Sequence, residues 1–209
     1  MEISYIFLNI YFIFYLLLYL IVHIPFDILM IFKRSGAKYP SPPFKNIIQG
    51  ICFVIPSLLF WGYITIVPLT STFLQADLYS LPVLNFIPPV VKFTFQLIGL
   101  IIASIGLLID ALGRIGRGTY LKNPTPVLST TWGHAIVRHP SYFHYITGFI
   151  SLPLITFNPI LLILLFGIYG YVSVTNTEET ALIEYFGEDY INYMNEVGKI
   201  FPKIRKSRN

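Results

Sequence analysis

The sequence contains few charged residues. Asp, Glu, Lys and Arg together make up only 11% of its 209 residues, compared with roughly 25% in a soluble globular domain. Apolar residues account for 55%, which is more hydrocarbon than a single core of this size can bury. These proportions exclude a soluble domain and predict an integral membrane protein.

Cysteine is almost absent. The only one is Cys52, inside an apolar segment, so a disulfide framework and a thiolate metal site are excluded. The basic residues gather at segment ends: of fourteen Lys and Arg, four lie in 33–45, four in 114–138 and five in 199–208. This clustering is typical of cytoplasmic membrane loops and not of a nucleic-acid-binding surface. The first apolar run begins at Ile3 without a basic leader or a cleavage site, which favours a retained helix over a signal peptide.

The apolar runs predict about five membrane-spanning helices, because a span needs about 20 residues. We expect them at 3–32, 47–69, 90–112, 142–157 and 160–175, the last two forming a tight hairpin at Asn158-Pro159. The segments without Lys or Arg alternate with the basic ones, which predicts an outside N-terminus, with the C-terminus and active site in the cytoplasm. A prokaryotic cell membrane and the endoplasmic reticulum both remain open.

The predicted fold class is therefore an all-α polytopic membrane protein with a cytoplasmic amphipathic C-terminal helix. We divide it into three N-terminal spans (1–112) and a catalytic region (113–209) that contains a cofactor loop, the hairpin and the last helix.

The third predicted span carries small residues on one stripe, which allow another helix to approach closely in lipid. They are Gly99, Ala103, Gly106 and Gly113. Asp110 lies on the same stripe with Arg114 one turn later, and an internal ion pair is the favoured interpretation, although a functional role stays open. His23 and Asp27, one turn apart in the first span, are expected to be hydrogen-bonded packing residues.

The loop before the hairpin ends in Arg138-His139-Pro140-Ser141-Tyr142. Pro140 suits the first turn of a helix, so Arg138 and His139 should lie at a helix N-terminus, where an anion is favoured. The alternative is that these basic residues only mark the cytoplasmic end of a membrane span, in accordance with the positive-inside rule.

After the hairpin, Glu178 and Glu179 fall on or beside the apolar face that contains Leu182. Carboxylates there are costly unless a cation pairs with them. The alternative is ordinary N-terminal charge, if a new helix begins at Asn176. Because the hairpin brings its two ends together, the sequence predicts a site for a ligand with a negative and a positive end.

These motifs resemble the isoprenylcysteine carboxyl methyltransferase and phospholipid methyltransferase group of integral membrane enzymes. The group's pattern is Arg-His-Pro-x-Tyr, a helical hairpin, Glu-Glu-x-x-Leu, Phe-Gly-x-x-Tyr-x-x-Tyr and a final Pro. Here it is matched by 138–142, 178–182, 186–193 and Phe201-Pro202. The resemblance covers about 128–202. It departs from the pattern at His134, where a Tyr is usual, and at His144, where Gly is common.

The resemblance implies S-adenosylmethionine as cofactor and methyl transfer to a lipophilic or prenylated acceptor that enters from the bilayer. It implies catalytic roles for Arg138, Glu178 and Glu179. The implied cofactor-binding residues are His134, Arg138, His139, Pro140, Tyr142, Glu178, Glu179 and Leu182. Membrane lipids are the other expected partners. No metal is expected, since the spacing of His134, His139 and His144 matches no ligand signature.

The acceptor stays open. The carboxylate of a prenylated cysteine is favoured, with a phospholipid amine, a small thiol or an isoprenoid as alternatives. A membrane sterol or lipid reductase using NADPH is the competing enzyme class, although the acidic pair argues against it. A non-catalytic membrane scaffold would leave both acids unexplained.

Overall fold

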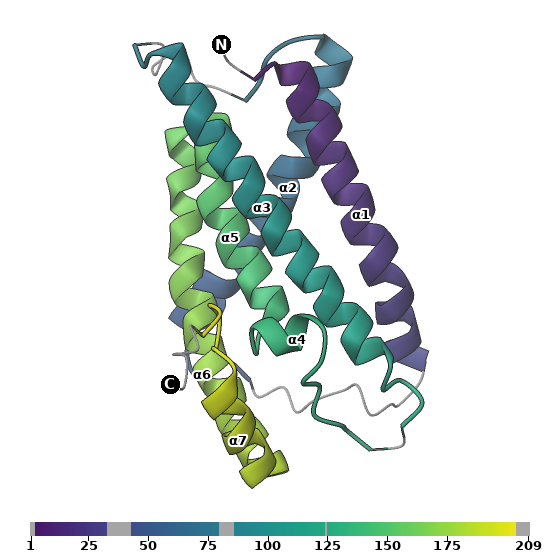
Figure 1. The fold of residues 1–209 in the computed structure, drawn as a ribbon. Coiled ribbons are helices and arrows are strands. Elements are labelled where there is room, and N and C mark those ends of the chain that lie inside the picture. The colour runs from purple at the N-terminus through teal and green to yellow at the C-terminus, as the bar shows by residue number, and fades with distance from the viewer. Residues whose placement is uncertain (1–2, 33–42, 80–85, 124, 204–209) are drawn as a thin grey trace, which may run out of the picture.

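The chain folds into a bundle of long helices (Figure 1), which a computed structural model describes for residues 3–32, 43–79, 86–123 and 125–203. The helices in chain order are α1 (Tyr5–Phe32), α2 (Ile47–Leu74), α3 (Pro89–Gly118), α4 (Gly133–Ile136), α5 (Pro140–Thr156), the 3-10 helix η2 (Pro159–Leu165), α6 (Phe166–Phe186) and α7 (Glu188–Glu196). Within these described residues no strand forms, and the only isolated bridge is a parallel one between Val137 and Gly198. The predicted all-α fold is confirmed.

Four helical segments in the described part of the chain are long and apolar enough to cross a membrane: Tyr5–Leu29, Ile47–Leu74, Pro89–Gly118 and Pro159–Phe186. Large apolar side chains on α1, α2 and α3 are exposed at the bundle surface, as expected for helices that face lipid. The chain is an integral membrane protein. The fourth expected span, 142–157, corresponds to α5, which has only 17 residues and is buried among the other helices instead of facing lipid along its length. The fifth, 160–175, lies in η2 and α6.

Helices α3 and α5 pack closely along the predicted stripe of small residues. A Cβ atom added at Gly106 would lie 2.0 Å from Oγ1 of Thr147, and one at Gly113 would lie 2.6 Å from Cβ of Pro140. At Gly99 it would lie 2.8 Å from Ile155. The close approach in lipid that the sequence predicted is therefore present, and it sets the first turn of α5 against the end of α3.

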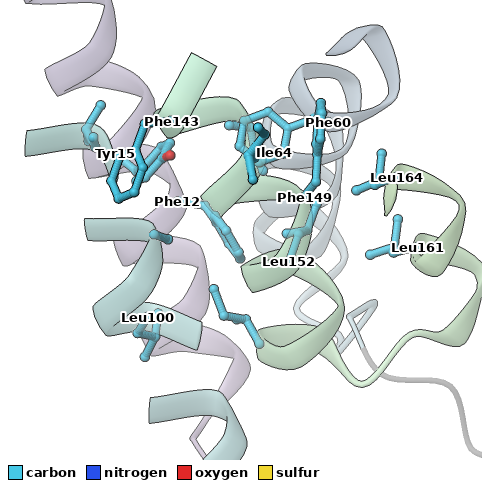
Figure 2. Packing of buried hydrophobic residues seen from close by; sticks show 14 of the residues in the cluster. Phe12, Tyr15, Phe60, Ile64, Leu100, Phe143, Phe149, Leu152, Leu161 and Leu164 are labelled. Carbon is cyan, nitrogen blue, oxygen red and sulfur yellow. The ribbon is translucent and has the colours of Figure 1, made fainter. Parts of the chain in front are cut away.

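Apolar side chains fill the space between the helices (Figure 2). Phe12 and Tyr15 of α1, Phe60 and Ile64 of α2 and Leu100 of α3 are buried with residues of α5 and η2. The labelled residues from α5 and η2 are Phe143, Phe149, Leu152, Leu161 and Leu164. This packing makes α5 the centre of the bundle and fixes the position of both of its ends.

Asp110 does not pair with Arg114, so the expected ion pair within α3 is wrong. Oδ2 of Asp110 lies 3.0 Å from Nε2 of His23, and Arg114 instead donates to Asp27 at 2.8 Å. Since α1 packs against α3, the charged groups find partners on the neighbouring helix. His23 also bonds the Tyr19 carbonyl oxygen through Nδ1, at 2.9 Å, which agrees with the expected hydrogen-bonded packing.

Helix α6 continues without interruption from the apolar segment through Glu178 and Glu179. The alternative of ordinary N-terminal charge is therefore wrong, because no helix begins at Asn176. The predicted single C-terminal helix is instead broken at Gly187, whose φ of 57° lies in the left-handed region that favours glycine. The break folds α7 back, so that Tyr190, Tyr193 and Val197 pack with Leu182 of α6.

Candidate cofactor site

A short parallel bridge positions the two basic residues that precede α5. The backbone N–H of Arg138 donates to the Gly198 carbonyl oxygen at 2.9 Å, and that of His139 donates to Lys199 at 3.1 Å. Residues about 60 positions apart are thereby joined at the end of the bundle where α4, α7 and the start of α5 lie together (Figure 1). The bridge brings Lys199 next to the basic pair.

Glu179 lies at the centre of this cluster and is almost fully buried. Its Oε1 lies 2.8 Å from Nε of Arg138 and 3.3 Å from Nε2 of His139, and its Oε2 lies 2.8 Å from Nζ of Lys199. The Tyr190 hydroxyl donates to Oε1 at 3.4 Å. A buried carboxylate requires such compensation, and here every contact stabilises its charged form.

The Arg138 guanidinium has further partners beyond Glu179. Its Nη1 donates to the carbonyl oxygens of Met194, at 3.2 Å, and Val197. Arg138 therefore connects Glu179 of α6 to the last turn of α7 and to Val197, which follows it. Its contacts are those of a residue that organises the site, and the charge predicted to bind an external anion is largely used within the protein.

Glu178 differs from its neighbour because it keeps partial access to solvent. The Tyr142 hydroxyl donates to Oε1 of Glu178 at 2.6 Å, and Nδ1 of His139 lies 3.6 Å from Oε2. Its side chain is 21% exposed, compared with 6% for Glu179. The rings of His139 and Tyr142 stack with their centroids 5.5 Å apart. Glu178 is thus a carboxylate held in place with capacity to accept further hydrogen bonds.

His134 lies next to the site and contacts the backbone of Arg138. Its Nδ1 is 3.2 Å from the Arg138 carbonyl oxygen, and its own carbonyl oxygen accepts a hydrogen bond from the Tyr193 hydroxyl at 2.6 Å. Burial, with a contribution from the positive charge of Arg117, lowers the pKa of His134 to about 3. Burial, reinforced by the negative charge of Glu179, raises the pKa of Tyr190. His134 is therefore neutral at physiological pH and supports the loop that holds Arg138.

The structure brings together most of the residues that the sequence singled out. Arg138, His139, Tyr142, Glu178 and Glu179 form one cluster, and His134 lies beside it. Pro140 lies against Gly113, and Leu182 packs in the apolar cluster with α7, so these two lie at its margins. Their predicted roles in cofactor binding stay predictions.

Sequence reasoning named neither Lys199 nor Tyr190 as a site residue. Lys199 was one of five basic residues near the C-terminus, and its spacing does not distinguish it from them, because the bridge between Val137 and Gly198 brings it to the start of α5. For Tyr190 the available signal was its place as the first tyrosine of the Phe-Gly-x-x-Tyr-x-x-Tyr match at 186–193. Among the described residues, no three His, Cys, Asp or Glu side chains are arranged to hold a metal ion.

Comparisons with known proteins show what this chain is similar to. It is 36% identical over 83 residues to methanethiol S-methyltransferase of Pseudomonas deceptionensis, covering 40% of this chain and 29% of the relative. It is 36% identical over 85 residues to protein-S-isoprenylcysteine O-methyltransferase of Saccharomyces cerevisiae, covering 40% and 36%. The enzyme of that name from Dictyostelium discoideum is 30% identical over 132 residues, covering 57% and 54%. No protein-family model matches the chain.

The matched segments span only about a third to a half of the length of these relatives. Their names nevertheless confirm the resemblance predicted from the motifs, since all three are methyltransferases. They also show that acceptors of two kinds, a thiol and a prenylated cysteine, occur among proteins similar to this one.

Proposed function

We propose that this protein is an S-adenosylmethionine-dependent methyltransferase that acts on an acceptor taken from the membrane. The observation that carries the proposal is the position of a partly exposed carboxylate, Glu178, next to a group of basic residues: His139 lies 3.6 Å from Glu178 and, with Arg138 and Lys199, contacts Glu179. S-adenosylmethionine has a carboxylate at one end of its amino-acid portion and an ammonium and a sulfonium group nearby, so it needs both signs of charge within a short distance.

The residues present fit such a cofactor. Lys199 has 30% of its side chain exposed, and it offers positive charge to a carboxylate at the N-terminal end of α5, where the His139 imidazole lies beside it. Glu178 offers an acceptor for an ammonium group or for hydroxyl groups. The Tyr142 ring, stacked on His139, supplies an aromatic face on which a cation can rest. When bound, the cofactor would supply the methyl group on a positively charged sulfur.

We assign different tasks to the two acids. Glu179, bonded to Arg138, Lys199, the His139 imidazole and a tyrosine, holds the basic residues in place. Glu178 contacts the cofactor. Since the transition state of methyl transfer disperses positive charge, the protein's main contributions are positioning and the exclusion of water.

The acceptor proposed from the sequence is the carboxylate of a prenylated cysteine or a related lipid, and the similarity to isoprenylcysteine methyltransferases supports it. A thiol acceptor is supported equally by the methanethiol methyltransferases. In both cases the acceptor would enter from the bilayer, because apolar helices surround the site on the membrane side. A cytoplasmic location of the cofactor site remains our proposal, based on the distribution of Lys and Arg.

Binding of S-adenosylhomocysteine, the product form of the cofactor, tests the proposal. Calorimetric titration of the purified protein should give saturable binding, and Glu178→Gln should weaken it at least about 10-fold because a charge-assisted hydrogen bond is lost. Glu184→Gln is the matched control, since Glu184 is an exposed acid of the same helix. Arg138→Ala should abolish binding.

Two results would overturn the proposal: no binding to the wild-type protein, or equal affinities for wild type and Glu178→Gln. A thermal-shift comparison with NADPH separates the competing enzyme class. Stabilisation by NADPH and not by S-adenosylhomocysteine would identify a reductase instead.

A further inference from the structure

A second group of buried polar side chains lies within the bundle, about one helical turn beyond the start of α5. Asp110 of α3 accepts a hydrogen bond from the Ser141 hydroxyl at 2.7 Å and lies 3.0 Å from Nε2 of His23. His144, one turn after Ser141 on α5, has no exposed surface. Residues three apart on a helix lie on the same face, so His144 and Ser141 both belong to this group.

The imidazole of His144 has one unused nitrogen. Nδ1 lies 3.3 Å from the Tyr15 hydroxyl, whereas Nε2 has no hydrogen-bond partner in the described part of the chain. A buried polar atom without a partner is costly and calls for an explanation. When Nδ1–H donates to Tyr15, Nε2 carries the free lone pair of a base.

Aromatic rings surround this nitrogen and make the environment apolar. The ring centroids of Tyr19, Trp61 and Tyr145 lie 5.7, 6.0 and 5.4 Å from that of His144. Ring contacts link this group to the candidate cofactor site: the ring centroid of Tyr145 lies 4.8 Å from that of Tyr171, whose centroid lies 5.1 Å from that of Tyr142 in an edge-to-face contact. His144 is thereby linked through packed rings to Tyr142, whose hydroxyl donates to Glu178.

The charges near His144 determine which acceptor can be tolerated. Asp110 and His23 are close enough to interact with it electrostatically, and so is Arg114, which is already paired with Asp27. The titratable hydroxyls that face the ring are those of Tyr15, Tyr19 and Tyr145. An acceptor carboxylate here would lie near the Asp110 carboxylate in a medium that screens charge poorly, which is unfavourable.

A neutral acceptor that must lose a proton suits this group better. A thiol is easier to deprotonate than an alkylammonium group, because the reference pKa of a cysteine thiol is about 8.5 and that of an alkylammonium group about 10.4. Aromatic rings also make favourable contacts with sulfur.

We propose that His144 is the base that accepts the proton of a thiol methyl acceptor, with Asp110 as the positioning residue whose carboxylate stabilises the resulting imidazolium and His23 as the residue that holds Asp110 in place. This proposal rests on the methyl transfer proposed above and names its substrate class. The S–H bond of the acceptor breaks, its proton passes to Nε2 of His144, and the thiolate electron pair forms the new S–CH3 bond. The bond between the methyl group and the cofactor's sulfur breaks, and its electron pair stays on that sulfur.

The test compares two thiols of different acidity. His144→Gln should lower kcat/KM for an alkanethiol about 100-fold or more, the usual contribution of a general base. It should lower kcat/KM for an aromatic thiol, already largely ionised at neutral pH, less than about 10-fold. The affinity for S-adenosylhomocysteine, measured by calorimetry, should stay within about 3-fold of wild type. Ser151→Ala, at a buried serine of the same helix whose hydroxyl bonds its own backbone, should change none of these values.

Asp110→Asn provides a second variant of almost unchanged shape. It should show a smaller loss that again is greater for the alkanethiol, because the proton taken up by His144 is then less well stabilised. Equal losses for both thiols in either variant, with cofactor affinity intact, would show a structural role and overturn the proposal.

The failure of this inference can be told from the failure of the proposed function. A wild-type protein that binds S-adenosylhomocysteine and methylates a prenylated cysteine or a phospholipid amine, but neither thiol, would overturn the thiol assignment and leave the methyltransferase proposal standing. A wild-type protein that binds no S-adenosylhomocysteine would overturn both.

Discussion

Two buried carboxylates, Glu179 and Asp110, have very different surroundings. Glu179 is bonded to two cationic side chains, an imidazole and a tyrosine, so its charge is fully compensated. Asp110 has one imidazole and one hydroxyl as partners, with the unpartnered nitrogen of His144 nearby. A buried carboxylate whose charge and hydrogen bonds are fully compensated fixes a structure, whereas a buried polar group with an unused hydrogen-bonding position can still bind a ligand or a proton.

Replacing each acid by alanine should separate these two roles most clearly. Glu179→Ala should lower the free energy of unfolding by about 3–5 kcal/mol, because it leaves buried Arg138 without its counterion. Asp110→Ala should cost only about 1–3 kcal/mol, since Ser141 can bond its own helix. Denaturant titration in detergent micelles measures both. Equal losses would contradict the distinction.

The contact between α3 and α5, which holds Ser141 against Asp110, gives a smaller effect. Gly106→Ala should destabilise the protein by about 1–3 kcal/mol, because the added Cβ would lie 2.0 Å from Oγ1 of Thr147. Gly62→Ala is the control, since nothing lies within 4 Å of its added Cβ. If both variants unfold at the same denaturant concentration, the close approach does not support the Asp110 group.

The region around Glu179 should also respond to pH through His134. Burial lowers the pKa of His134 to about 3 from its ordinary value of 6.5, so between these values the unfolded chain binds a proton that the folded chain does not. Stability should therefore fall as the pH decreases from 6.5 towards 3, by about 1 kcal/mol per pH unit.

Unfolding titrations at pH 7, 6 and 5 test this expectation against His134→Gln, which keeps an N–H donor for the Arg138 carbonyl oxygen. The variant should lose less stability on acidification than wild type. Identical slopes would show that His134 contributes nothing to the pH dependence.

The sequence predicted which residues lie together at the candidate cofactor site, because local rules govern their positions. Pro140 begins α5, as its fixed backbone angle favours, and Arg138 and His139 therefore lie at a helix start. Glu178 and Glu179 follow the hairpin on the same side, since antiparallel neighbours bring their ends together. The small residues of α3 predicted a close helix contact for the same kind of reason, because their spacing places them on one face.

The sequence failed where long-range pairing decided the outcome. Asp110 and Arg114 were expected to bond each other, yet each found a closer partner on α1, in His23 and Asp27. Lys199 gave no indication of its role until the bridge at Gly198 placed it beside Glu179. Such partners depend on which helices pack together and on how far each helix is shifted along its axis relative to its neighbour. The periodicity of a single helix gives no information on these two points.

Scarcity of charge, by itself, determined that this is a membrane protein, because water-free surroundings exclude unpaired charges from all but a few positions. The motifs at 138–142 and 178–182 predicted which of those positions carry the chemistry. Only the tertiary structure decided that Glu179 is compensated while Glu178 is accessible, and that His144 keeps an unused nitrogen near Asp110. The reason is physical: the state of a buried polar group depends on every atom that surrounds it, and those atoms come from distant parts of the chain.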